Sequence, residues 1–204
     1  MDLPGRTGGG EREIDGGARE AAAFELLRAA VAGLAAGEID VSDATRSMAP
    51  LLVGGERLRW RRRTPRFGDV AVFFRGRALV AHRVVGRSGA ALRTKGDALA
   101  ALDGWTVPPE DVVGVAEAVV FPRGARSLAG APARLYALAA AAWSRGGGAL
   151  FGAAARLDAL LGAGASAWRA RRAAFWLQRA GALALHGLLF RAAHRTIDAP
   201  RRAP

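Results

Sequence analysis

Polar and apolar residues alternate with the period of a β-strand through the middle of the chain. Residues 57–60 alternate charged and apolar side chains, which is typical of a half-buried strand. Glycine and charged residues separate the apolar runs, as in the turn at 75–77. This pattern predicts a small coiled or barrel-like β domain built from short strands. The other runs that we assign to strands are 70–74, 78–85, 91–94 and 112–120.

Residues 18–36 have the periodicity of a helix instead. Acidic residues such as Glu20 and Glu25 lie on the side opposite an apolar stripe. The stretch is too short and too charged to span a bilayer, so we expect it to pack on the β domain. The stripe consists of Phe24, Leu26, Leu27, Val31 and Leu34.

The chain after residue 122 is rich in alanine, leucine, arginine and glycine, again with helical periodicity. Glycine-rich runs at 146–148 and 162–164 interrupt it, and glycine is a poor helix former. None of the resulting segments is an uninterrupted apolar run near the ~20 residues that cross a membrane. We therefore expect three helices, at 128–144, 149–162 and 166–194.

Charge divides the chain near residue 122. Residues 1–122 hold 17 Lys and Arg against 16 Asp and Glu, whereas residues 123–204 hold 13 Arg against 2 Asp. We predict an α+β protein in three parts: a disordered lead, a β domain with its N-terminal helix, and a basic helical region. The lead is glycine-rich and charged and has no apolar segment of a signal peptide. The three parts are 1–19, 20–122 and 123–204.

The composition excludes several kinds of chemistry. The chain contains no cysteine, which excludes disulfides, thiolate nucleophiles and cysteine-based metal sites. Three histidines in the whole sequence are too few for a histidine-rich metal cluster. Arginine stays protonated and cannot act as a general base. A base for a hydroxyl nucleophile must therefore come from a histidine, from a carboxylate, or from Lys95, which is the one lysine of the protein.

Four short motifs follow one another between residues 46 and 97. They contain a hydroxyl nucleophile (Ser47), a base (His82) and a carboxylate (Asp97), and Asp103 follows the last motif. These are the components of a serine hydrolase, whose members lie apart in sequence and meet in the fold. The motifs are Arg-Ser-Met-Ala-Pro at 46–50, Phe-Gly-Asp-Val at 67–70, Ala-His-Arg-Val-Val at 81–85 and Thr-Lys-Gly-Asp at 94–97.

The surroundings of Ser47 and His82 suit these roles. Pro50 favours a rigid turn, which would present the hydroxyl of Ser47 to a groove. Strand alternation places His82 on one face with Val80 and Val84, so the imidazole is partly desolvated and kept neutral. The alternative interpretations are an ordinary loop serine and a half-buried structural histidine.

The order of the motifs resembles the catalytic domain of signal peptidase I, in the histidine-type branch of archaea and the endoplasmic reticulum. Residues 47–50 match the Ser-Met-x-Pro motif of the nucleophile, and 82–84 match the motif of the base in its histidine form. Residues 68–70 match a Gly-Asp-Val motif, and 95–97 match Lys-Gly-Asp. The resemblance covers about 40–120. It implies a serine endopeptidase that cleaves extended peptides or proteins after small residues, as in signal peptide processing, without a cofactor.

The resemblance also implies roles for individual residues. Asp103 corresponds to the acid that orients the histidine and completes the catalytic set, whereas Asp97 corresponds to a structural or secondary acid. The backbone N–H of Ser47 and the hydroxyl of Thr45 correspond to donors of an oxyanion hole. Arg46 stands where the family usually has glycine.

Two other functions remain open at this stage. Arg46 and the missing membrane anchor favour an inactive homologue that binds peptides or docks on membranes. A LexA-type self-cleaving regulator shares the catalytic fold, but the residues before Ser47 do not fit a helix-turn-helix domain.

The basic helical region has three interpretations: packing against itself, peripheral contact with an anionic membrane, and nucleic-acid binding, for which support is thin. Aromatic residues and arginines are interleaved in 166–194, which suits the first two. The location that we expect is cytoplasmic or peripheral at a membrane.

Overall fold

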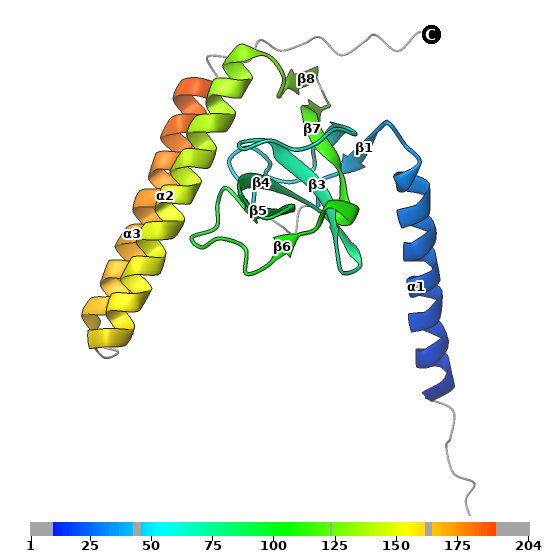
Figure 1. The fold of residues 1–204 in the computed structure, drawn as a ribbon, viewed down its shortest axis with the longest axis horizontal. Coiled ribbons are helices and arrows are strands. Elements are labelled where there is room, and N and C mark those ends of the chain that lie inside the picture. Colours follow the sequence, from blue (N-terminus) through cyan, green and yellow to red (C-terminus); the bar gives the residue numbers. More distant parts are fainter. Residues whose placement is uncertain (1–9, 43–45, 123, 162–164, 191–204) are drawn as a thin grey trace, which may run out of the picture.

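The computed structural model describes residues 10–42, 46–122, 124–161 and 165–190. An eight-stranded sheet lies between helix α1 (Gly10–Ala32) on one side and a hairpin of two helices on the other (Figure 1). The strand order is β1-β2-β7-β3-β4-β5-β6, with β8 also paired to β7, and each described pairing is antiparallel. The strands are β1 (Ala36–Asp40), β2 (Arg57–Arg61), β3 (Val70–Arg75), β4 (Ala78–Ser88), β5 (Ala91–Lys95), β6 (Thr106–Val107), β7 (Val112–Phe121) and β8 (Gly124–Ser127), with a 3₁₀ turn at Pro109–Asp111.

The molecule is thus a mixed structure of helices and a mostly antiparallel, open sheet, which agrees with the predicted α+β class. Exposed and buried residues alternate along β2, as the sequence pattern predicts. The β3–β4 hairpin also forms where the sequence places it, and Gly76 in its turn has a φ of +57°. Strand β8 lies past residue 122, so the β domain extends beyond the boundary that the change in charge indicated.

Two apolar clusters fill the β domain. The larger lies between the sheet, the segment after Ser47 and the start of the first hairpin helix; the smaller lies under β4 and β5. Each fully buried large apolar side chain contributes about 1.5–3 kcal/mol. The larger cluster includes Met48, Leu51, Leu52, Leu58, Trp60, Val72, Phe74, Tyr136 and Ala140, and the smaller consists of Ala71, Phe73, Val84, Leu92 and Val107.

Helix α1 departs from its prediction in two ways. It begins at Gly10, so residues 10–19, which we expected to be an unstructured lead, are helical; residues 1–9 lie outside the described part of the chain. Its apolar stripe packs only in part. Phe24 meets the ring of Phe74 edge-on and Val31 is buried, whereas Leu26 is 73 % exposed.

Helix α2 (Ala131–Leu161) replaces the first two helices that we predicted after residue 122. It continues through the glycines at 146–148, although each costs roughly 1 kcal/mol relative to alanine. Packing explains the exception at Gly147, because a Cβ there would lie 2.8 Å from the side chain of Gln178 on the next helix. The glycine therefore permits a close approach between helices and does not end the first one.

Helix α3 (Ala165–Leu185) folds back along α2 and ends in a π-helical turn at His186–Phe190 (Figure 1). Gly181 lets the ring of Trp143 lie against the α3 backbone, since a Cβ there would be 2.0 Å from that ring. The predicted continuation to 194 lies outside the described residues. None of the described helices is both long and apolar enough to span a membrane.

Candidate active site

Ser47 lies in a turn between β1 and β2 that is anchored in the protein core. Met48 and Leu51 are both 3 % exposed, so the chain on the C-terminal side of the serine is fixed by packing. Ser47 itself is half-buried. The peptide bond between Ala49 and Pro50 is cis. The motif therefore does form the fixed turn that the proline predicted.

The turn is also joined to the segment that follows β5. The backbone N–H of Ala98 donates a hydrogen bond to the carbonyl oxygen of Ser47, at 2.8 Å. Gly96 makes this approach possible, because a Cβ at that position would lie 2.6 Å from the same oxygen. The glycine of the Thr-Lys-Gly-Asp motif is thus required by contact with the serine turn.

His82 lies on β4, on the face where the alternation pattern placed it. It is buried, and Phe73 of the smaller apolar cluster meets its ring edge-on, with centroids 6.4 Å apart. Its Nε2 atom is 3.0 Å from Oγ of Ser47. Its Nδ1 atom is 2.8 Å from Oδ2 of Asp103. Three residues from separate elements therefore form one continuous hydrogen-bonded chain.

The direction of these hydrogen bonds follows from the chemistry of Asp103. An ionised carboxylate only accepts hydrogen bonds, so Nδ1 of His82 carries the proton that it donates to Asp103. In the neutral ring Nε2 then has a free lone pair, which accepts the hydroxyl hydrogen of Ser47. This arrangement is ready to remove the proton from Ser47 as its oxygen attacks.

Asp103 is held by a second donor. The hydroxyl of Thr94 donates to the same Oδ2 atom at 2.6 Å, and the backbone N–H of Asp103 donates to the carbonyl of Thr94 at 3.2 Å. The carboxylate is 1 % exposed, and its Oδ1 atom accepts no hydrogen bond from the described residues. Thr94 and His82 thus both hold the carboxylate of Asp103 through its Oδ2 atom.

Asp97 is separated from this chain of residues. Its two oxygens accept hydrogen bonds from Nε and Nη2 of Arg83, at 2.7 and 2.5 Å, and both side chains are buried. Arg83 also donates Nη1 to the carbonyl of Gly68. Of the two candidate acids, Asp103 therefore contacts the histidine, whereas Asp97 pairs with Arg83.

Lys95 is the remaining base that the sequence offered. It is fully buried, and its Nζ donates a hydrogen bond to the carbonyl of Gly96 at 3.4 Å. Burial lowers the pKa of Lys95 to about 8, against the opposing charges of Asp97 and Asp103. Of these two bases, it is His82 that hydrogen-bonds the serine hydroxyl.

No family model matches the chain. A search of curated proteins likewise returns no relative of it. The likeness to signal peptidase I thus rests on the motifs between residues 46 and 97, and it stays a prediction. The inference of hydrolase chemistry is drawn from the hydrogen bonds that join Ser47, His82 and Asp103.

Part of the predicted oxyanion hole falls within the described residues. The backbone N–H of Ser47, the first predicted donor, forms no hydrogen bond with the part of the chain that the structure describes. Thr45, the second predicted donor, lies outside the described residues. Arg46 is exposed beside the serine. The second donor therefore remains a prediction from the sequence.

Three positioning residues were missed by sequence reasoning. Thr94 supports Asp103, and its place in the Thr-Lys-Gly-Asp motif was a usable signal. Arg83 neutralises Asp97, and it adjoins the histidine in its own motif. Gln178 of α3 is buried and donates Nε2 to the carbonyl of Leu99, at 2.8 Å, in the segment that carries Asp103. Nothing in the sequence indicated that contact, since 79 residues separate its ends.

Proposed function

We propose that this protein is a serine endopeptidase. The observation that supports this most directly is the hydrogen-bonded chain from Oγ of Ser47 through the ring of His82 to Asp103, with distances of 3.0 and 2.8 Å. Both distances lie within the range required for proton transfer between nucleophile and base. The order of the surrounding motifs, which resembles signal peptidase I, supports a peptide as the substrate.

In the proposed mechanism Oγ of Ser47 attacks the carbonyl carbon of the scissile peptide bond while Nε2 of His82 takes the hydroxyl proton. The backbone N–H of Ser47 donates to the oxygen that becomes negative. His82 then gives its proton to the leaving amine, which breaks the C–N bond and leaves an acyl group on the serine.

Water completes the cycle. His82 removes a proton from water as the water oxygen attacks the acyl carbon, and then returns that proton to Oγ of Ser47. Asp103 remains ionised throughout and stabilises the imidazolium that forms at each step. Thr94 holds the carboxylate in place through its hydroxyl. No step requires a metal or an organic cofactor.

A fluorophosphonate probe tests this function, because it forms a stable bond with an activated serine. We expect the full-length protein to gain one probe mass on Ser47, and Ser47→Ala to gain none. A matched control is Ser88→Ala, which removes an exposed serine at the end of β4. If wild type and Ser47→Ala label equally, or if neither labels, the peptidase proposal is wrong.

The second candidate is a peptide-binding homologue without activity. Arg46 favours it, because an exposed, bulky cation stands directly beside the serine where the resembled family has glycine. The same probe separates the two candidates, since a binding module leaves the serine unlabelled. Arg46→Gly distinguishes them further: faster labelling in this variant indicates an active site that the arginine obstructs.

We also propose that the helical hairpin contacts an anionic membrane surface. The described part of α3 exposes Trp176, Leu177 and Leu183, while Arg172 and Arg179 are exposed on the same helix. A hollow of about 650 Å³ between α2 and α3 is lined mainly by apolar side chains. Exposed aromatic and apolar groups with arginines nearby are typical of helices that lie in the membrane interface.

A further inference from the structure

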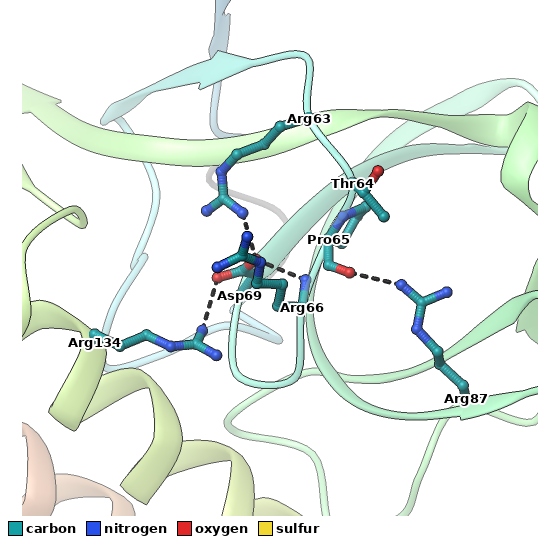
Figure 2. A pocket seen from close by; sticks show the side chains of 7 residues that line it. All are labelled: Arg63, Thr64, Pro65, Arg66, Asp69, Arg87 and Arg134. Atoms are coloured by element: carbon teal, nitrogen blue, oxygen red, sulfur yellow. Dashed lines mark hydrogen bonds and ion pairs between the residues drawn. The ribbon is translucent and has the colours of Figure 1, made fainter.

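A second pocket lies on the β domain, between the loop at 62–69 and the first turns of α2. Its volume is about 530 Å³, within the range of small-molecule sites. Figure 2 shows that Arg63 and Arg134 reach Asp69 from two different elements, while Arg87 contacts the loop from β4. The lining residues are Arg63, Thr64, Pro65, Arg66, Asp69, Arg87 and Arg134.

The lining carries four arginines and one carboxylate, a net charge of +3. Asp69 is already occupied: its Oδ1 accepts from Arg134 at 3.0 Å, and its Oδ2 accepts from Arg63 and from the backbone N–H of Arg66, both at 2.7 Å. The guanidinium of Arg66 makes no hydrogen bond or ion pair with the described residues. Most of the positive charge in the pocket is therefore not neutralised within it.

The pocket is built on a fixed frame. Gly68 has a φ of +92°, and its N–H donates to the carbonyl of Val84 on β4, at 2.8 Å. A Cβ at Gly68 would lie 2.9 Å from the carbonyl oxygen of Ala137, so the loop is held close against α2. Arg87 donates Nη2 to the carbonyl of Pro65 at 2.7 Å, which orients its guanidinium (Figure 2). Little rearrangement is then needed to receive an anion.

An apolar hollow adjoins this pocket. It has a volume of about 450 Å³, and its lining includes four residues that the two hollows share: Arg63, Thr64, Pro65 and Arg87. The rest of its lining is mainly apolar and consists of Arg62, Ala90, Leu92, Pro109, Val112 and Val113. A ligand with a charged head and an apolar body can therefore occupy both hollows at once.

We propose that the arginine pocket binds a phosphomonoester through its phosphate group. Guanidinium groups match the oxygens of phosphate in paired hydrogen bonds, and a dianion offsets most of the +3 charge. The hydroxyl of Thr64 is a further donor at the rim. The adjoining hollow takes the apolar part of the ester. The ligand is either a free phosphate ester or the headgroup of a lipid such as phosphatidic acid.

Calorimetric titration of the full-length protein tests this proposal, at constant ionic strength set with chloride. The probes are inorganic phosphate, phenyl phosphate, and vesicles of phosphatidylcholine with or without phosphatidic acid. We expect saturable binding of phenyl phosphate, tighter than that of inorganic phosphate because the ring enters the apolar hollow. Vesicle binding that requires phosphatidic acid and depends on Arg66 indicates the lipid source.

The decisive variant is Arg66→Gln, because the guanidinium that it removes has no partner among the described residues and the fold should persist. Loss of a charge-assisted hydrogen bond pair weakens binding about tenfold. Arg93→Gln, which removes an exposed arginine of β5 outside the pocket, should bind as wild type does. The proposal is wrong if none of the probes binds saturably. It is also wrong if Arg66→Gln and Arg93→Gln weaken phosphate binding equally.

The result is independent of the peptidase proposal. Labelling of Ser47 by a fluorophosphonate is expected to be unchanged in Arg66→Gln. Phosphate binding with an unreactive serine would support the pocket alone, and a reactive serine without phosphate binding would support the peptidase alone.

Discussion

The β domain and the helical hairpin differ in which side chains they bury and which they expose to solvent. The β domain buries polar groups on β4 and β5 and pairs them with residues of the serine turn and of the segment 96–103, whereas the hairpin exposes large apolar groups to solvent. Buried polar residues need fixed partners, so they are found where geometry must be exact. The buried polar residues of the β domain include His82, Arg83, Thr94, Lys95 and Asp97, and the exposed apolar ones of the hairpin include Leu135, Trp176, Leu177, Leu183 and Leu188.

A side-chain hydrogen bond is among the contacts that join the two regions near the proposed active site. The side-chain amide of Gln178 on α3 donates to the backbone carbonyl of Leu99. The backbone carbonyl of Gln178 accepts a hydrogen bond from the indole of Trp143 on α2, at 3.0 Å. The hairpin therefore supports the segment 96–103 from outside. If chemistry lies in the β domain and surface binding lies in the hairpin, changes in each region should have separable effects.

The largest effect is expected for Asp103→Asn. The amide donates toward Nδ1 and favours the wrong tautomer of His82, so the rate of fluorophosphonate labelling should fall by about 10⁴-fold. Vesicle binding through the hairpin should be unchanged. The matched control is Asp111→Asn, which removes a carboxylate that pairs with Arg28 outside the site. A variant of Asp103 that labels at the rate of wild type would contradict the proposed role.

Asp97→Asn should act on stability instead. It leaves the buried guanidinium of Arg83 without its carboxylate, which costs about 3–5 kcal/mol of unfolding free energy. Urea unfolding followed by circular dichroism measures the loss. Replacing both partners, in Arg83→Met with Asp97→Leu, should recover much of it. If Asp97→Asn lowers the unfolding free energy no more than the loss of an exposed carboxylate does, the Arg83–Asp97 pair does not stabilise the β domain.

Lys95→Met should stabilise the β domain in a pH-dependent way. Burial lowers the pKa of Lys95 from 10.5 in an exposed chain to about 8, so its ammonium is disfavoured in the folded state. This cost is fully present below pH 8 and disappears as the pH rises to 10.5. At pH 7 the variant should gain at most about 3 kcal/mol.

Urea unfolding at pH 7 and at pH 10.5 checks this difference. Arg93→Met changes an exposed cation on the same strand, and it should change stability little at either pH. A Lys95→Met protein that is less stable than wild type at pH 7 would show that the ammonium is bound favourably in the β domain.

The smallest effect is expected in the hairpin. Replacing Trp176 and Leu177 by serine should weaken binding to anionic vesicles about tenfold or more, because two exposed apolar groups no longer enter the interface. Vesicle flotation measures this. Leu26→Ser removes an exposed leucine from α1 and should have no effect on flotation. Loss of labelling of Ser47 in the hairpin variant would show that the two regions are not separable.

The β domain was the more predictable region, because polar and apolar residues alternate along its strands and this pattern is visible in the local sequence. The burial of β2 and the face of His82 follow from period-two patterns. The hairpin was not predictable in the same way. Local propensity favours a break at the glycines of α2, and only packing against Gln178 shows why the helix continues. The length of α1 was missed because glycine and charge indicated disorder.

The two proposed sites also differ in how far the local sequence predicts them. Ser47 and His82 lie in short motifs that can be compared with a known family, and Asp103 follows the last of these motifs, so all three were predicted from the sequence. The arginine pocket was not found, although the basic loop near Arg63 and Arg66 is visible in the sequence. It depends on Arg134, which pairs with Asp69 across 65 residues.

The protonation of the His82 ring tests the central claim most directly. Nitrogen NMR of the labelled protein, with His82→Gln used to assign the signals, reports which ring nitrogen carries hydrogen in the neutral form. We predict a proton on Nδ1, protected by Asp103, and a bare Nε2 that accepts from Ser47. A neutral ring with its proton on Nε2 could not take the proton of the serine, and it would contradict the account.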